Sequence, residues 1–541
     1  MQAEETDIII VGSGPAGSVI ANRLSEHGDL QISVVEAGPG DHHPFIHIPA
    51  GFIKMIFNPA YIWPFKTKSS SWTGGREINV LQGRVVGGSS SINGLIYNRG
   101  QAADFDGWAQ IGNPGWDYDS VLPYFIKSEA FLGKGDDGFR GRGGLLSTSE
   151  LDWRHPLCDR FVAGALELGI PWNSDYNGKS QEGVGYYQRI IRGRRRISAA
   201  RAFLLPALKR SNLNLRTNSV VSRILFDKRK AIGVEYISGG GKGERRKLMA
   251  RKEVIISAGT INTPRLLQIS GVGSPNDLCS LGIPLTLSLP GVGANLQDHY
   301  SVRVVARAKN IRTINELARG PQLLGQIASW LLGRPSILTL SPSLIHIFAR
   351  SNPKIDVPDL QGVFSPASYK EGFVGQLDDH PGMTCGFWQH RPLSVGYVRA
   401  RSADPLDLPE IQPNYLSHSQ DRDVLVAGIK LARELLRSSP LQPFFDFEAL
   451  PGKQVETDDE ILDFASRYGV SSWHLVGTSK MGPATDPQAV VDPRLRVHGL
   501  DNLRIADASI MPVSPSANTF ATSVMIGEKA ADFIKQDMKT P

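Results

Sequence analysis

Two short apolar runs near the start of the chain predict buried strands with a helix between them. Ile8 to Val11 and Ile32 to Val35 consist mostly of β-branched residues, a pattern typical of parallel strands that are buried on both faces. Between these runs, Val19 and Leu24 lie on one side of a helical pattern. A glycine-rich turn precedes this helix, and the second run ends at Glu36. The order of elements predicts a βαβ unit in a parallel sheet.

The turn, Gly12-Ser13-Gly14-Pro15-Ala16-Gly17, has the spacing of a dinucleotide-binding loop. Gly12 permits the tight turn, Gly14 lets the backbone approach a pyrophosphate, and Gly17 lets the helix pack closely on the strand. The helix N-terminus favours an anion, and Glu36 is placed to accept hydrogen bonds from ribose hydroxyls. A glycine-rich surface turn is the alternative interpretation, but the flanking strands and the acid favour dinucleotide binding. The motif itself does not choose between FAD and NAD.

The remaining hydrophobic pattern predicts further helices and a second sheet. Helices are expected within 101–131 and at 156–168, 421–436, 458–468 and 519–533. Strands are expected within 212–234, at 253–257 and at 502–506, with a hairpin tip at 238–243. Thr263 and Pro264 suit the N-cap and the first position of another helix. Alternating stretches at 344–348 and 384–389 suit an antiparallel sheet away from the dinucleotide unit.

Length and composition indicate an ordinary globular protein of two or three domains. The 541 residues are 41% hydrophobic and 21% charged, and the net charge of +6 is small for this length. Basic residues are scattered apart from those at 192–196, so nucleic-acid binding is not indicated. Cys158, Cys279 and Cys385 are far apart and odd in number, which implies neither a disulfide framework nor a metal site.

The sequence gives no sign of secretion or of an integral membrane segment. It begins with acidic residues and enters a strand almost at once, without the charged and apolar regions of a signal peptide. The most apolar region, Pro321 to Phe348, is interrupted by glycine, proline and Arg334, and we expect it to form helices that line a pocket. Together with the dispersed cysteines, these observations favour a cytoplasmic protein.

Gly83 to Gly100 is a second segment rich in small residues. Residues of this size cannot fill a core well, so the segment is expected to let its backbone pass close to a large, flat group. Its serines and Asn93 offer hydrogen bonds to such a group.

Four motifs together make the chain resemble the glucose–methanol–choline (GMC) family of flavin oxidoreductases. They are GSGPAG with Glu36, GRVVGGSSSINGLIYNRG, SAGTINTPRLLQISGVG, and WHLVGTSKMG followed by VSPSANTFATSVMIGEKAAD. The resemblance covers nearly the whole chain. It implies an α/β fold in which a Rossmann-like FAD-binding domain is interleaved with a substrate domain built on an antiparallel sheet. The expected FAD domain comprises residues 1–144, 191–300 and 485–541, and the expected substrate domain comprises residues 145–190 and 301–484.

The resemblance also implies a reaction, in which an alcohol is oxidised to an aldehyde by hydride transfer to N5 of the flavin. His474 would be the general base, or the acceptor of a hydrogen bond that stabilises a developing alkoxide, because the pKa of imidazole suits this task near neutrality. A histidine beside a tryptophan is otherwise more often a packed core residue. Asn518 would hold the substrate hydroxyl, cap the last helix, or both. The N-terminus of that helix, at Thr519, would favour negative charge on the reduced flavin.

By the same resemblance, residues from every motif would contact FAD. They are Gly12, Gly14, Pro15, Ala16, Gly17, Glu36, Ala37, Arg84, Gly88, Ser89, Asn93, Gly94, Leu95, Val221, Ala258, Trp473, Asp507, Ala508, Asn518 and Thr519.

At two positions this sequence differs from some members of the family, and these differences bear on how FAD is attached and on which alcohol is oxidised. Ile92 stands where some members carry a histidine that bonds covalently to the flavin, so noncovalent FAD is expected. Leu344 stands where choline-acting members are expected to carry a glutamate, so a non-ionic primary alcohol, aromatic or aliphatic, is favoured over choline. Phe348, Phe387, Trp388 and Trp473 are expected to line the substrate pocket.

Three alternatives stay open at this point. They are a choline dehydrogenase, a redox-neutral lyase of the hydroxynitrile lyase type that uses FAD as a scaffold, and a flavin-binding protein without turnover. The sequence does not name the alcohol, the oligomeric state or the electron acceptor, which is oxygen or another compound.

Overall fold

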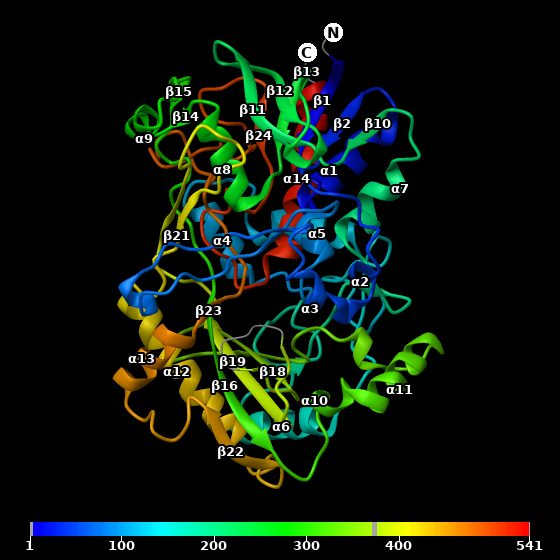
Figure 1. Cartoon of the computed structure of the whole chain (residues 1–541), viewed down its shortest axis with the longest axis vertical. Helices are drawn as coiled ribbons and strands as arrows, with labels where there is room; N and C mark the ends of the chain where they lie inside the picture. Colours follow the sequence, from blue (N-terminus) through cyan, green and yellow to red (C-terminus); the bar gives the residue numbers. More distant parts are fainter. Residues whose placement is uncertain (1–3, 371–375, 540–541) are drawn as a thin grey trace.

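The computed structural model describes residues 4–370 and 376–539. Its elements form two halves, each centred on a sheet, that lie one above the other along the long axis of the molecule (Figure 1). Both chain ends lie at the same end of the molecule, beside the first sheet (Figure 1). The family fold expected from the sequence, an α/β unit joined to an antiparallel sheet, is therefore confirmed.

The first sheet has the strand order β10-β2-β1-β13-β12-β11, and β24 pairs with β13. Its parallel part consists of β10 (Leu213–Arg216), β2 (Ile32–Val35), β1 (Glu4–Val11), β13 (Arg245–Ile256) and β24 (Leu503–Ile505). The strands β12 (Lys230–Ile237) and β11 (Val220–Asp227) extend it in antiparallel fashion. Strands far apart in the chain thus end at one edge, which is where parallel sheets bind nucleotides.

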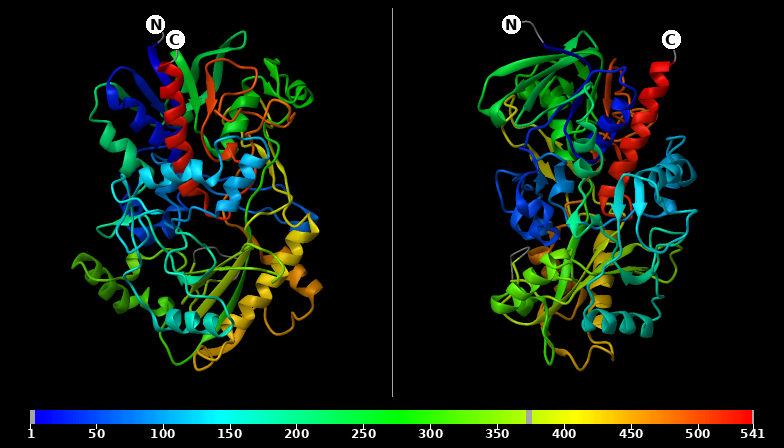
Figure 2. Two further views of the ribbon diagram at one scale, coloured as in Figure 1. Left: turned by 180° about the vertical axis from the view of Figure 1, so that it is seen from behind. Right: turned by 90° about the vertical axis from the view of Figure 1, so that its right-hand side faces the viewer.

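Two helices from opposite ends of the chain pack together in this half. They are α1 (Pro15–Leu24) and α14 (Thr519–Lys539), and Figure 2 shows α14, in red, beside the blue N-terminal elements. Gly527 allows the close approach, because a Cβ atom there would lie 2.8 Å from the carbonyl oxygen of Ala16.

The second sheet is antiparallel and has the order β22-β16-β19-β18-β17-β7, with β23 (Val470–Ser471) paired to β16. Its strands are β22 (Phe445–Leu450), β16 (Tyr300–Ala308), β19 (Gly382–Gln389), β18 (Leu360–Ser365), β17 (Ile345–Ala349) and β7 (Gly183–Tyr186). The helices α12 (Ser419–Leu436) and α6 (Pro156–Glu167) cover one face, and α13 (Asp458–Tyr468) packs on α12. The other face is free to line a cavity.

The remaining elements are short or connect the two halves. The helices are α2 (Pro44–His47), α3 (Phe52–Met55), α4 (Ala102–Gln110), α5 (Tyr118–Ser128), α7 (Leu205–Ala207), α8 (Gly259–Ile269), α9 (Pro275–Ser280), α10 (Ile314–Leu317) and α11 (Gly320–Leu331). The strands are β3 (Ile62–Trp63), β4 (Gln82–Gly83), β5 (Glu129–Phe131), β6 (Leu146–Thr148), β8 (Ile191–Arg192), β9 (Arg195–Arg196), β14 (Val272–Gly273), β15 (Leu287–Ser288), β20 (Tyr397–Arg399) and β21 (Glu410–Gln412). The exact limits of the two expected domains stay a prediction.

The expected start of α8 is wrong. The helix begins at Gly259, so Pro264 lies inside it rather than at its first position. Proline has no N–H to donate to the carbonyl four residues earlier, and here the hydroxyl of Thr478 donates to that carbonyl of Thr260 at 2.5 Å. Thr263, expected as the N-cap, instead donates its hydroxyl to Asp507 at 2.6 Å.

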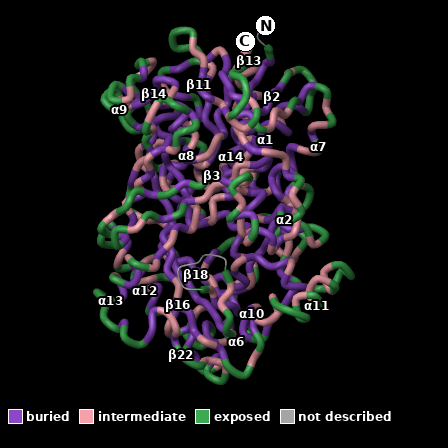
Figure 3. The backbone as a smooth tube through the Cα atoms, viewed as in Figure 1, coloured by how far each residue is buried: buried purple, intermediate pink, exposed green. Residues whose placement is uncertain are grey.

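The apolar region from Pro321 to Phe348 also differs from expectation, because its helix does not line the cavity between the two sheets, although Pro342 and Ser343 do. None of the residues of α11 is buried, and Leu324, Leu331 and Leu332 are 68%, 68% and 71% exposed. Figure 3 shows this helix at the periphery of the second half. No helix in residues 4–370 and 376–539 is long and apolar enough to cross a membrane.

Candidate active site

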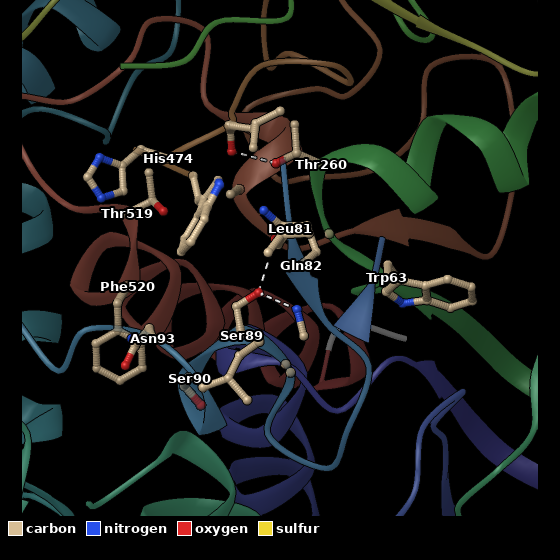
Figure 4. A pocket seen from close by; sticks show the side chains of 18 of the residues that line it. Trp63, Leu81, Gln82, Ser89, Ser90, Asn93, Thr260, His474, Thr519 and Phe520 are labelled. Atoms are coloured by element: carbon tan, nitrogen blue, oxygen red, sulfur yellow. Dashed lines mark hydrogen bonds between the residues drawn. The ribbon is translucent and has the colours of Figure 1, made fainter. Parts of the chain in front are cut away.

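A cavity lies between the two sheets, and both halves of the molecule line it. The first half contributes the ends of β1 and β2, the start of α1, the second glycine-rich segment and the start of α14. The second half contributes side chains from β16, β18 and β19. Figure 4 shows His474 and Thr519 close together on one side of the cavity, with Ser89, Ser90 and Asn93 below them. The cavity therefore connects the dinucleotide loop with the antiparallel sheet.

The glycines of the first motif have the geometry that a dinucleotide loop requires. Gly12 has φ +97°, a conformation that L side chains rarely adopt, and a Cβ atom there would lie 2.4 Å from the carbonyl oxygen of Ser257. A Cβ atom on Gly17 would lie 2.2 Å from the carbonyl oxygen of Gly12, so only glycine lets α1 pack so closely. Gly14 is the N-cap of α1 and, as a glycine, has no side chain that could accept a hydrogen bond from the first turn of the helix. The N–H groups of that turn are thus free to bind an anion such as a diphosphate.

Glu36 is buried at the end of β2 and organises the loop. Its Oε2 accepts hydrogen bonds from the backbone N–H and the hydroxyl of Ser13, at 2.9 and 2.6 Å, and its Oε1 accepts from the N–H of Gly38 at 2.8 Å. Burial raises the pKa of this carboxyl, and the bonds from Ser13 and Gly38 oppose that rise. Glu36 also lines the cavity, so lone pairs of its carboxylate can still accept bonds from a ribose.

Most residues that the sequence assigned to FAD line this cavity. Those that do are Gly12, Gly14, Pro15, Ala16, Glu36, Ala37, Gly88, Ser89, Asn93, Gly94, Leu95, Val221, Ala258, Trp473, Asp507, Ala508, Asn518 and Thr519. Gly17 and Arg84 do not. Gly17 acts through helix packing, and the guanidinium of Arg84 donates to the carbonyl of Gly240 at 2.7 Å and lies over Trp63.

His474 is presented to the cavity by a strained turn. The preceding Trp473 has φ 61°, a conformation that is rare for a bulky residue and is held here by surrounding bonds. The N–H of Trp473 donates to the hydroxyl of Ser471, and its indole N–H donates to the carbonyl of Asn79, both at 2.9 Å. The backbone N–H of His474 donates to Asp298 at 2.8 Å.

A chain of hydrogen bonds determines which ring nitrogen of His474 carries the proton. Nε2 of His299 lies 2.6 Å from the carbonyl oxygen of His390, so this nitrogen carries the proton and donates it. In a neutral ring, Nδ1 of His299 is then an acceptor, and it lies 2.9 Å from Nδ1 of His474. Nδ1 of His474 therefore donates, which leaves its Nε2 as an acceptor. The amide nitrogen of Asn518 lies 2.9 Å from that Nε2.

The electrostatic environment keeps this histidine pair neutral. Burial, with a smaller contribution from the charge of His299, lowers the pKa of His474 well below its ordinary value. Burial also lowers the pKa of His299 to about 4. Next to them, burial raises the pKa of Asp298 to about 6, against hydrogen bonds from Ser471 and Tyr415. At neutral pH, Nε2 of His474 is thus an unprotonated acceptor that lines the cavity and accepts a hydrogen bond from Asn518.

The structure separates the four residues that the sequence assigned to the substrate pocket. Trp388 and Trp473 line the cavity. Phe387 points to the other face of β19 and belongs to the core under α12, and Phe348 packs with Tyr176 and Tyr187. Leu344, expected where choline-acting members carry a carboxylate, is also buried in that core. The argument against choline that used Leu344 therefore does not hold for this fold.

Several residues that line the cavity were not predicted from the sequence. Phe52, Ile53 and Ile56 of the α3 segment form an apolar wall, and Ser301 and Arg303 of β16 form part of the sheet floor. The residues that orient His474 could have been found from one feature of the sequence. Asp298 and His299 are two polar residues directly before an apolar strand.

The fold and cavity define a class, namely a dinucleotide-dependent α/β oxidoreductase with an antiparallel sheet over its cofactor site. Models of the GMC oxidoreductase family match residues 6–301 and 392–527, which is more than half of the chain. The protein therefore belongs to the GMC oxidoreductase family. The cofactor of the family, FAD, fits the loop geometry described above, and the enzyme is an FAD-dependent oxidoreductase of the class that acts on CH–OH groups.

Individual relatives agree with this assignment over the full length. Mitochondrial choline dehydrogenase from Homo sapiens is 38% identical over 550 residues, which cover 98% of this chain and 90% of that protein. The crystal structure of pyridoxine 4-oxidase from Mesorbium loti superposes with a TM-score of 0.88 at 30% identity, covering 98% and 99% of the two chains. An FAD-dependent oxidoreductase from Chaetomium thermophilum gives a TM-score of 0.90 at 28% identity, covering 99% and 100%.

Proposed function

We propose that this protein oxidises a primary alcohol to the aldehyde, with His474 as the base that takes the hydroxyl proton. The observation that supports this most directly is the unprotonated Nε2 of His474, 2.9 Å from the amide of Asn518, in the cavity that contains the dinucleotide loop. A substrate hydroxyl that replaces this direct contact would donate to Nε2 and accept from the amide. Both contacts stabilise the alkoxide character that develops as the C–H bond breaks.

FAD would be held by the loop at Gly12 to Gly17, by Glu36 at the ribose and by the small residues from Gly88 to Leu95. When bound, it supplies the two-electron acceptor for the reaction. The N-terminus of α14, at Thr519, lines the same cavity and favours negative charge there. We propose that FAD is bound noncovalently, because Ile92, at the expected attachment position, lines the cavity with a side chain that has no nucleophile.

The walls of the cavity support an apolar or aromatic portion in the substrate. The rings of Trp388 and His474 lie 5.9 Å apart, and Trp473 lines the same cavity. A hydrocarbon chain or ring would pack against these indoles. The partners that we propose are thus a small-molecule alcohol and an electron acceptor, either oxygen or another compound. A cytoplasmic location stays a prediction.

Anaerobic reduction of the bound flavin tests this proposal. An alcohol should bleach the flavin absorbance of the parent enzyme, and a His474→Ala variant that retains its flavin should be slower by about a hundredfold or more. His27→Ala, at an exposed histidine of the first half, is the matched control and should react like the parent. A redox-neutral lyase or a binding protein without turnover would leave the flavin oxidised with every alcohol, which would reject the proposal.

A further inference from the structure

Arg303 places a positive charge in the part of the cavity that faces the substrate. It lies on β16, where side chains alternate between the two faces of the sheet. Val302 and Val304 pack into the core under the sheet, whereas Ser301 and Arg303 line the cavity. Among the described lining residues, the other ionisable acids and cations are Glu36, Arg265 and Asp507, which belong to elements of the dinucleotide half.

Among the residues that the structure describes, this arginine has no counter-ion. Within residues 4–370 and 376–539, its guanidinium forms no hydrogen bond and no ion pair, and the one charged or polar group that influences it is Tyr369, whose ring centroid lies 5.7 Å away. By contrast, the buried Arg99 and Arg504 form ion pairs with Glu129 and Glu253, each at 2.6 Å, and the buried Arg196 and Arg265 donate to carbonyl oxygens. Burial lowers the pKa of Arg303, but an arginine keeps its proton in proteins. A cation held away from bulk water is costly unless it is paired.

The sheet is built to accommodate this side chain. Gly386 of β19 lies directly opposite Arg303 in the strand register. A Cβ atom on Gly386 would lie 3.0 Å from Cγ of Arg303 and 3.6 Å from Cγ2 of Val363. The stem of the arginine thus lies over the glycine, across the middle of the sheet floor. Val363 and Ser365 of β18 line the cavity beyond it.

The separation between Arg303 and the reacting group sets the length of a ligand that could reach both. His299, whose ring contacts His474, stands four residues before Arg303 on the same stretch of chain. At the rise of a β-strand, this corresponds to about 13 Å between the two Cα atoms. Because the side chains of Arg303 and His474 also extend into the cavity, the ligand itself is shorter than this Cα separation, and it carries its anionic group several bonds away from its CH–OH carbon.

We propose that the substrate is an alcohol that also carries a carboxylate, which Arg303 binds while the CH–OH end lies at His474 and Asn518. This inference rests on the proposed function and replaces the non-ionic substrate expected from the sequence. The planar guanidinium presents paired N–H groups that match the two oxygens of a carboxylate. The hydroxyl of Ser301 lines the same floor and can donate to the same group. A cationic substrate would instead meet the positive charge of Arg303.

The test compares matched substrates on the flavin-loaded enzyme. In flavin reduction, 4-(hydroxymethyl)benzoate should exceed its methyl ester in kcat/KM by about tenfold or more, as expected for a charge-assisted pair. Arg303→Gln should bring this ratio close to one, and Arg303→Lys should keep part of it. Arg307→Gln is the control, because Arg307 lies on the same strand but pairs with Asp378 outside the cavity lining. The control should keep the full ratio.

A binding measurement separates this inference from the proposed function. The unreactive 4-methylbenzoate should bind the flavin-loaded parent, and Arg303→Gln should weaken its Kd by about tenfold or more. Equal binding to both proteins, or equal turnover of acid and ester by the parent, would overturn the carboxylate site while alcohol oxidation stands. If no alcohol reduces the flavin, the proposed function fails. A larger kcat/KM for 4-(hydroxymethyl)phenyl phosphate than for the benzoate would reject the carboxylate as the ligand.

Discussion

The imidazole rings of His299 and His474 face each other through their Nδ1 atoms, 2.9 Å apart and nearly perpendicular, with an interplanar angle of 83°. Because Nε2 of His299 donates to the carbonyl of His390, only one tautomer of His474 fits this contact. That tautomer leaves the cavity-facing nitrogen unprotonated. We therefore assign His299 as a positioning residue for the proposed base.

The first prediction concerns this positioning. His299→Phe removes the acceptor for Nδ1–H of His474, so the ring can adopt the other tautomer or rotate. We expect flavin reduction to slow by about ten- to a hundredfold with the flavin still bound. His299→Gln, whose carbonyl oxygen can accept the same proton, should recover part of the loss. Stopped-flow reduction measures both variants, and equal rates for Phe and Gln would show that volume rather than the hydrogen bond matters.

The second prediction concerns Asn518. Removing its amide in Asn518→Ala takes away one of the two proposed contacts of the substrate oxygen but leaves the base in place. The loss should be smaller than in His474→Ala, about tenfold, as expected for one hydrogen bond of about 1–2 kcal/mol. Single-turnover reduction with one alcohol compares the two variants. A loss as large as that of His474→Ala would mean that the amide orients the imidazole rather than the substrate.

The third prediction concerns pH. The pKa of Asp298 is raised to about 6 by burial, so its carboxylate gains a proton as the pH falls through this value. The protonated form can no longer accept hydrogen bonds from the backbone N–H of His474 and from the hydroxyls of Ser471 and Tyr415 together. We expect kcat/KM to fall on the acidic side with an apparent pKa near 6. His474, whose pKa is far lower, stays neutral there.

The assignment of this acidic limb can be checked with Asp298→Asn. The amide does not titrate, so the limb near pH 6 should disappear even if the overall rate is lower. An unchanged limb in this variant would assign the titration to another group.

The fourth prediction concerns the binding of FAD. Acid precipitation should leave the yellow colour in the supernatant, because Ile92 offers no atom for a covalent bond. Glu36→Ala should lower FAD occupancy, since it removes an acceptor for the ribose and releases the bonds to Ser13 and Gly38. Charged hydrogen bonds of this kind contribute about 1.5–3 kcal/mol. Flavin retained in the pellet would contradict the noncovalent assignment.

The fifth prediction concerns choline. Leu344 gives no reason to exclude choline, but Arg303 lies on the sheet side of the cavity. Among the described residues, the acids that line the cavity are Glu36 and Asp507 in the dinucleotide half. A trimethylammonium group has no donor and is recognised by aromatic faces and carboxylates. A benzyl-type or medium-chain alcohol should therefore exceed choline in kcat/KM. Choline ahead by tenfold would mean that a carboxylate reaches the pocket.

Features encoded by local spacing were predicted well from the sequence. The strand Ile32–Val35 and the helix Asp458–Tyr468 have the bounds that their apolar patterns indicated. The glycine loop was also predictable, because the strand, turn and helix that define it are contiguous in the chain. Its close approaches follow from the absence of Cβ atoms at Gly12 and Gly17.

Features that depend on distant partners could not be predicted in the same way. All eight residues of β19 are buried, so alternation does not reveal that Trp388 faces a cavity while Phe387 faces the core. The start of α8 depends on the hydroxyl of Thr478, far along the chain, which satisfies the carbonyl of Thr260 in place of the proline N–H. The exposed α11 has the apolar composition of a core helix, and only the fold shows that nothing in the described chain covers it.

The contact between α1 and α14 has a consequence for the order in which the enzyme matures. The helix that follows the phosphate loop packs through Ala16 and Val19 on Gly527 of α14, so its partner is synthesised much later than α1 itself. The edge strand β24, beside β13, is likewise made late. During translation the N-terminal unit would therefore lack its neighbours until β24 and α14 have been synthesised, and stable capture of the flavin would have to wait for them.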